Sequence, residues 1–110
     1  HIEVALIAML PGGHGDEQVG VARYSTNIDR TSCEFALVVS DAWHGRGLGH
    51  HLMSDLMSVA RDRDLEQIEG QVLANNKRML KLMTSMGFSI SNDSEDASIK
   101  RVVARLHKMN

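Results

Sequence analysis

The sequence predicts an α/β fold of the α+β type: three strands, a helix, a strand, a second helix and two closing strands. Three observations support this prediction. Three short apolar or alternating runs occupy the first 40 residues, at the spacing of strands. Apolar residues then recur at helical spacing after residue 47 and again after residue 76. Groups of Gly, Asn, Asp and Ser separate the runs and indicate turns.

The first three runs predict an antiparallel meander. Residues 4–10 are almost wholly apolar and predict a strand buried on both faces. Residues 18–25 contain the strand formers Val19, Val21 and Tyr24. Residues 33–40 form the third strand. Because the connections are short, consecutive strands are expected to pair antiparallel.

The second half of the chain alternates helices and strands. The first helical stripe consists of Leu48, Leu52, Met53, Leu56, Met57, Val59 and Ala60. Residues 67–73 predict a short strand. A second helix follows with Asn76 as its cap and Gly87 as its end. Residues 88–90 and 99–106 predict the last two strands, on either side of a polar, acidic loop.

Length and composition limit the function. The 110 residues suit one domain, 1–110, and the formal charge of −2 argues against a dedicated nucleic-acid binder. The single cysteine, Cys33, excludes an internal disulfide and predicts a reducing, cytoplasmic location. No apolar run approaches the ~20 residues of a membrane span. The first residue is His1, from which we expect a piece of a longer protein.

Three alternate glycines stand where the third strand gives way to the first helix. Gly45, Gly47 and Gly49 let the backbone approach a ligand closely. The first amides of a helix lack intrahelical partners and carry partial positive charge, so this junction predicts a phosphate site. His44 and Arg46 add side-chain charge. The alternative is a glycine-rich turn with no ligand. Neither the dinucleotide fingerprint nor the P-loop pattern fits these glycines.

These residues resemble a known signature. Residues 43–49 are similar to the acetyl-CoA signature of the GNAT superfamily of N-acetyltransferases, with His44 in place of the usual Gln or Arg. A second family motif is matched in spacing by Asn76, Met79, Leu80, Leu82, Gly87 and Phe88. Residues 19–24 and 33–39 resemble the C-terminal acetyltransferase domain of Pat-type protein lysine acetyltransferases more closely.

The resemblance implies a fold and an activity. The fold would be a mixed, mainly antiparallel sheet with helices on its faces, lacking the family's first strand and first two helices. The activity would be transfer of an acetyl group from acetyl-CoA to an amine, most simply a protein lysine. CoA-ligase-like domains would be attached in the full-length protein. The alternative is a non-catalytic domain that senses acyl-CoA and regulates its neighbours.

The resemblance also implies roles for individual residues. Val39 would offer its backbone amide to the oxyanion, and Asn76 would lie near the pantetheine arm unless it only caps its helix. Met83 stands where many members carry a tyrosine general acid. With Met79 and Leu80 it would flank the arm, the alternative being core packing. The expected cofactor-binding residues are Val39, Asp41, His44, Gly45, Arg46, Gly47, Leu48, Gly49, His50, Asn76, Met79, Leu80 and Met83.

Glu34 is the candidate general base. An attacking lysine must lose a proton, and a carboxylate on an otherwise apolar strand is costly unless it is paired or useful. The position of Glu34 resembles that of the catalytic glutamate in several protein acetyltransferases. The alternative is a solvated Glu34 or a pair with Arg23. The six histidines lack the spacing of metal ligands, so we expect no metal site.

Overall fold

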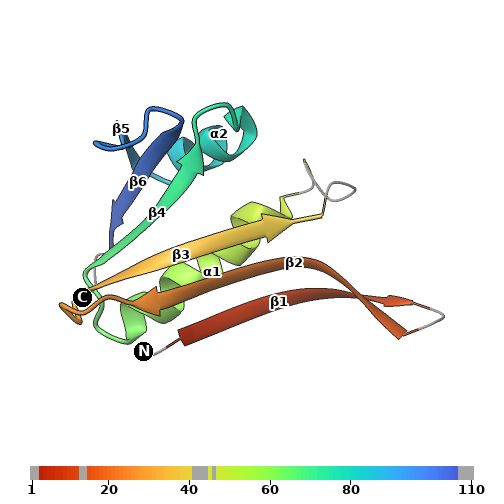
Figure 1. Cartoon of the computed structure of the whole chain (residues 1–110). Coiled ribbons are helices and arrows are strands. Elements are labelled where there is room, and N and C mark those ends of the chain that lie inside the picture. The colour runs from red at the N-terminus through yellow and green to blue at the C-terminus, as the bar shows by residue number, and fades with distance from the viewer. Residues whose placement is uncertain (1–2, 13–14, 41–44, 46, 107–110) are drawn as a thin grey trace.

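The structure is a computed structural model that describes residues 3–12, 15–40, 45 and 47–106. Figure 1 shows its elements in space. In chain order they are β1 (Glu3–Gly12), β2 (Gly15–Thr26), β3 (Ser32–Val39), α1 (Leu48–Asp62), β4 (Gln67–Leu73), α2 (Lys77–Ser85), β5 (Ser89–Asn92) and β6 (Ile99–Arg105). The order of strands and helices predicted from the sequence is confirmed, and residues 67–73 form β4 as expected.

The six strands form one sheet in the order β1-β2-β3-β4-β6-β5. Every neighbouring pair is antiparallel except β3 and β4, which are parallel. That pair is short, because only Ser32–Glu34 of β3 align with Gln67–Glu69 of β4. Beyond it the two strands diverge, as Figure 1 shows. The sheet therefore consists of two antiparallel halves joined at one end.

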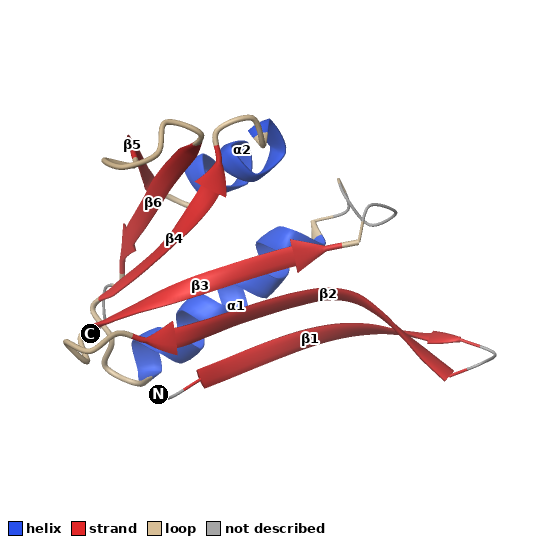
Figure 2. Ribbon diagram, viewed as in Figure 1, coloured by secondary structure: helices blue, strands red, loops and turns tan. Residues whose placement is uncertain are grey.

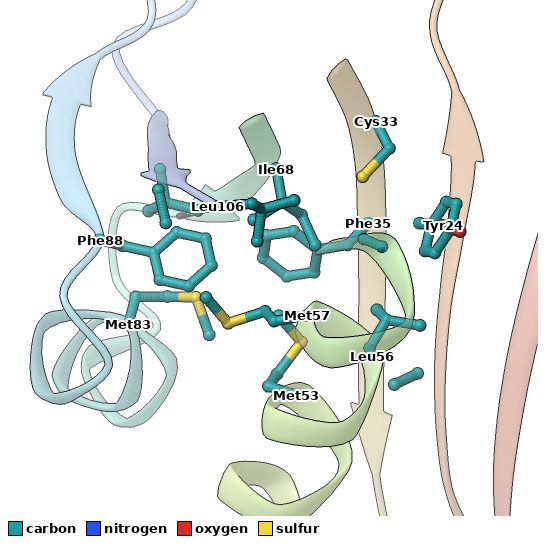
Figure 3. Packing of buried hydrophobic residues seen from close by; sticks show 14 of the residues in the cluster. Tyr24, Cys33, Phe35, Met53, Leu56, Met57, Ile68, Met83, Phe88 and Leu106 are labelled. Carbon is teal, nitrogen blue, oxygen red and sulfur yellow. The ribbon is translucent and has the colours of Figure 1, made fainter. Parts of the chain in front are cut away.

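Both described helices pack against one face of this sheet. Figure 2 shows α1 crossing behind β2 and β3. Met53 and Met57 of α1 meet Met83 of α2 under the rings of Phe35 and Phe88, as Figure 3 shows. The apolar stripes of the two helices therefore form one continuous core. The inward-facing residues of the strands, which alternate along each strand, form its other side. The expected mainly antiparallel sheet is confirmed, with its described helices on a single face.

A glycine in β4 makes room for an aromatic contact between the two halves of the sheet. A Cβ on Gly70 would lie 2.6 Å from Cε1 of Phe35, so an alanine there would collide with the ring. The Phe35 ring packs edge-on against Phe88, with ring centroids 5.6 Å apart. Phe35 thus spans from β3 across β4 to the residue that precedes β5.

The prediction that residues 4–10 are buried on both faces is wrong for the part of β1 whose side chains the structure describes. Val4 and Leu6 are half-buried against the core, while Ala5 is exposed. The reason is position: β1 is the edge strand, and the described helices cover one face only. No described helix has both the length and the apolar character needed to cross a bilayer.

Candidate functional site

Helix α1 begins at a glycine with a left-handed backbone. Gly47 is the N-cap, with φ 79° and ψ 2°, and Gly45 has φ 78°. A Cβ on either glycine would meet nothing within 4 Å, so the backbone conformation, and not the available space, requires glycine. No described side chain caps α1, and its first turn contains no acidic residue. Among the described residues, its first amides therefore have no side-chain partner, a geometry that suits an anion.

A pocket of about 300 Å³ opens at this helix start. Its walls come from the end of β3, the start of α1 and one side of α2. The described residues that line it are Leu37, Val39, Gly45, Gly47, Leu48, Gly49, His50, Asn76, Arg78, Met79, Lys81, Leu82 and Ser85.

The pocket combines positive charge with an apolar wall. His50, Arg78 and Lys81 can carry positive charge, and none of its described lining residues is acidic. The N-terminus of α1 adds the partial positive charge of the helix dipole. Leu37, Val39 and Leu82 lie on the apolar side. A ligand with an anionic end and a long, largely apolar arm suits this arrangement.

Many of the residues expected to bind the cofactor meet in this pocket. They are Val39, Gly45, Gly47, Leu48, Gly49, His50, Asn76 and Met79. Asp41, His44 and Arg46 lie outside the described residues.

Leu80 and Met83 do not line the pocket. Met83 is fully buried and lies in the core beside Phe88, as Figure 3 shows, and half-buried Leu80 packs against the same core. One turn of helix separates the two residues, so they share the inward side of α2 while the pocket occupies another side. The structure therefore places both in the core, which was the alternative for these residues.

Several lining residues were not expected from the sequence. They are Leu37, Arg78, Lys81, Leu82 and Ser85. A signal for most of them existed, because residues 78, 81, 82 and 85 recur at helical spacing along α2. Leu37 lies two residues before Val39 and therefore on the same face of β3.

Asn76 both caps α2 and lines the pocket. Its Oδ1 accepts a hydrogen bond from the backbone amide of Met79 at 3.2 Å. This bond confirms the capping role predicted from the sequence. Because the same residue lines the pocket, the cap leaves its amide group next to any ligand there.

Glu34 lies on the opposite face of the sheet from this pocket. It is exposed, and within the described residues no hydrogen bond or ion pair engages its side chain. With Glu69, Gly70, Gln71 and Arg101 it lines a hollow of about 140 Å³. Arg23 is on the same face of the sheet, opposite Ala36 of β3. The hollow lies where β3 and β4 begin to diverge.

Cys33 contributes packing and not chemistry. It is fully buried, as expected for a small apolar residue. Burial raises the pKa of its thiol to about 12, with a smaller contribution from the Glu69 carboxylate. A thiol with this pKa carries almost no thiolate near neutral pH. Among the described residues, no three His, Cys, Asp or Glu side chains gather as metal ligands would.

Comparison with known proteins agrees with this geometry. The model of the acetyltransferase (GNAT) family matches residues 5–88. An acetyltransferase of Pseudomonas aeruginosa is 30% identical over 103 residues, which are 94% of this chain and 54% of that protein.

Solved structures of known proteins share the fold, among them these two. The GNAT domain of S. lividans PAT superposes with a TM-score of 0.82 at 26% identity, over 94% of this chain and 61% of that one. The yncA protein of Salmonella typhimurium, solved with its cofactor acetyl-CoA, gives a TM-score of 0.72 at 21% identity, over 84% and 60% of the two chains. The chain spans little more than half the length of these relatives. It belongs to the GNAT family of acetyltransferases.

Proposed function

We propose that this chain binds acetyl-CoA in the pocket between α1 and α2 and transfers the acetyl group to a protein lysine. The observation that carries the proposal is the left-handed glycine start of α1, which opens onto a pocket with basic lining residues and an apolar wall. The amides of the first turn would hold the pyrophosphate. His50, Arg78 and Lys81 would balance the charge of the phosphates. The acetyl-CoA bound to yncA, which has the same fold, supports this ligand.

The same strand leads from the pocket to the candidate base. Leu37 and Val39 line the pocket, and Glu34 lies five residues before Val39 on β3. Five strand residues span about 16 Å. A pyrophosphate at Gly47 would therefore direct the pantetheine arm along β3 toward the point where β4 diverges. The acceptor would approach Glu34 from the open face of the sheet.

The residues of this strand would divide the chemistry. Glu34 would take a proton from the lysine ammonium. The neutral nitrogen would form a bond to the thioester carbonyl carbon and lose its second proton to solvent, the C–S bond would break, and the thiolate would take a proton from solvent. The Ser40 amide bonds to the Val19 carbonyl of β2 at 2.9 Å, so strand alternation directs the amides of Val39 and Leu37 toward the β4 side. Such amides would stabilise the oxyanion.

Two observations favour a lysine as the acceptor. The hollow around Glu34 is lined by two carboxylates, those of Glu34 and Glu69, against one guanidinium, that of Arg101, so its net negative charge suits a cationic side chain. The similarity to the GNAT domain of S. lividans PAT agrees with the resemblance to Pat-type lysine acetyltransferases in the sequence. Mass spectrometry of lysine-containing proteins after incubation with acetyl-CoA tests the acceptor directly. Binding of acetyl-CoA without acetylation of any protein would favour a sensing domain instead.

A titration of backbone amide shifts with acetyl-CoA tests the cofactor site. The largest shifts are expected at Gly45 and across residues 47–50, because these amides would face the phosphates. Smaller shifts are expected along the pocket side of α2. Shifts centred on the acidic loop at residues 92–97 would contradict the site.

Substitution of Glu34 tests the chemical step in the full-length protein. Glu34→Gln keeps the shape of the side chain and removes the proton acceptor. We expect kcat to fall by roughly 10²–10⁴, with little change in acetyl-CoA affinity. Raising the pH should recover part of the loss, because more of the acceptor lysine is then neutral. A folded variant with unchanged kcat would exclude Glu34 as the base.

A further inference from the structure

A second carboxylate, that of Glu69, lies beside Glu34 and accepts hydrogen bonds from two side chains. Glu69 of β4 is the register partner of Glu34 in the short parallel pair. Asn27 Nδ2 donates to Glu69 Oε1 at 2.9 Å, and Arg101 of β6 donates to Glu69 Oε2. The Glu69 side chain is 18% exposed, against 49% for Arg101. Both oxygens of Glu69 therefore have partners, and its orientation is fixed from two sides.

The neighbouring carboxylates thus differ sharply. Within the described residues, Glu69 holds a guanidinium and Glu34 holds none, although Arg101 lines the same hollow as Glu34. Around Glu34 on this face, Arg23 of β2 lies diagonally across, and Glu69 of β4 and Arg101 of β6 line the same hollow. A guanidinium forms strong, charge-assisted bonds to whichever carboxylate it reaches. If Arg101 left Glu69 and paired with Glu34, its guanidinium would occupy the space beside the Glu34 carboxylate.

We propose that Glu69 is a positioning residue for acetyl transfer, which keeps Arg101 away from Glu34 and leaves Glu34 available to the acceptor lysine. The inference rests on the proposed function, in which Glu34 is the base. Asn27 supports the arrangement by fixing the other oxygen of Glu69. With Glu69 neutral, Arg101 would turn to Glu34 and occupy the site of the lysine ammonium.

Steady-state kinetics of single and double variants of the full-length protein test this role. Glu69→Gln should lower kcat roughly tenfold or more, a part of the 10²–10⁴ that a general base contributes. The KM for acetyl-CoA should hold, because the cofactor pocket lies on the other face of the sheet. Arg101→Gln alone should cost less than Glu69→Gln. The double variant Glu69→Gln/Arg101→Gln should be several-fold faster than Glu69→Gln, because no guanidinium is left to block Glu34.

A purely structural Glu69 gives a different pattern. If the Glu69–Arg101 pair only joins the strands, the double variant will be no faster than Glu69→Gln, and kcat will follow the folded fraction in melting curves. Either result overturns the inference. Glu69→Asp, which keeps the charge, should retain more activity than Glu69→Gln even if both melt lower. Full activity of Glu34→Gln would overturn the base assignment and this inference together. If Glu34→Gln is slow but Arg101→Gln does not restore activity to Glu69→Gln, this inference alone is overturned.

Discussion

The two helices begin in opposite ways, although each follows a strand of the same sheet. Asn76 closes the start of α2 by accepting a hydrogen bond from the amide of Met79. Gly47 starts α1 with a left-handed backbone and no side chain to accept one. Both helices need partners for their first amides. Asn76 is the partner for α2, and under the proposed function a ligand would be the partner for α1.

Under the proposed function, the start of α1 gives up stability for binding. A capping side chain contributes about 1 kcal/mol, and glycine at a helix start contributes less. An acidic residue in the first turn would also favour the helix, yet α1 has none. Both omissions suit an anionic ligand. Substitutions at the start of each helix test this difference.

The largest effect is expected from Gly47→Val. Valine opposes the φ of 79° and places a branched side chain where the phosphate would sit. Acetyl-CoA affinity should fall roughly 100-fold or more, a change of about 2.7 kcal/mol measured by calorimetry. Gly87→Val is the matched control, since Gly87 has φ 87° and equally open space at its Cβ. It should lower stability without changing affinity. Equal affinity losses in both variants would contradict the site.

Met83→Tyr tests which side of α2 belongs to the core. Met83 is fully buried, so the larger tyrosine should destabilise the fold by about 1–3 kcal/mol in a denaturant titration. Met83→Leu conserves volume and should cost less than about 1.5 kcal/mol. A tyrosine variant as stable as the wild type and faster in turnover would instead place position 83 at the thioester.

Removing the cap of α2 should lower stability less than Met83→Tyr. Asn76→Ala removes the cap and should lower the free energy of unfolding by about 1 kcal/mol. Asn76→Ser retains a capping oxygen and should restore most of that stability. If Asn76 also contacts the pantetheine arm, both variants will bind acetyl-CoA more weakly. Wild-type affinity of Asn76→Ser would limit the residue to capping.

The smallest effect is expected from His50→Glu, which supplies α1 with the acidic residue that its first turn lacks. The helix dipole should stabilise the fold by about 0.3–1 kcal/mol. The same charge should weaken acetyl-CoA binding several-fold by repelling the phosphates. His50→Gln, a neutral control, should change stability little. A variant in which stability and affinity rise together would contradict an anionic ligand.

Local spacing predicts the elements well because each has its own signal. The period of apolar residues gave the strands and helices, and Asn76 and Gly87 marked the ends of α2. The glycines before α1 and the motif on α2 also predicted most of the pocket residues, because alternate glycines at a helix start have few other uses. Spacing could not tell which apolar residues of α2 face the core. Leu82 lines the pocket and Met83 the core, a choice made by packing against α1.

Contacts between segments that are distant in the sequence could not be predicted. The exposure of Ala5 depends on what covers the second face of the sheet, which no local period reports. The contacts of Glu69 with Asn27 and Arg101 join residues 42 and 32 positions apart. Such pairs follow from the strand order, and the strand order follows from the parallel step between β3 and β4.

The contact between Phe35 and Gly70 has a consequence for how this chain can vary. Adding a single methyl group at position 70 meets the Phe35 ring at 2.6 Å, while a smaller residue at 35 would leave a void beside Phe88. Neither position can change alone without cost, so the two are expected to be exchanged together in evolution. Gly70→Ala should therefore be tolerated only with a smaller residue at position 35. Positions 35 and 70, which are 35 residues apart in the sequence, are thus expected to covary among related proteins.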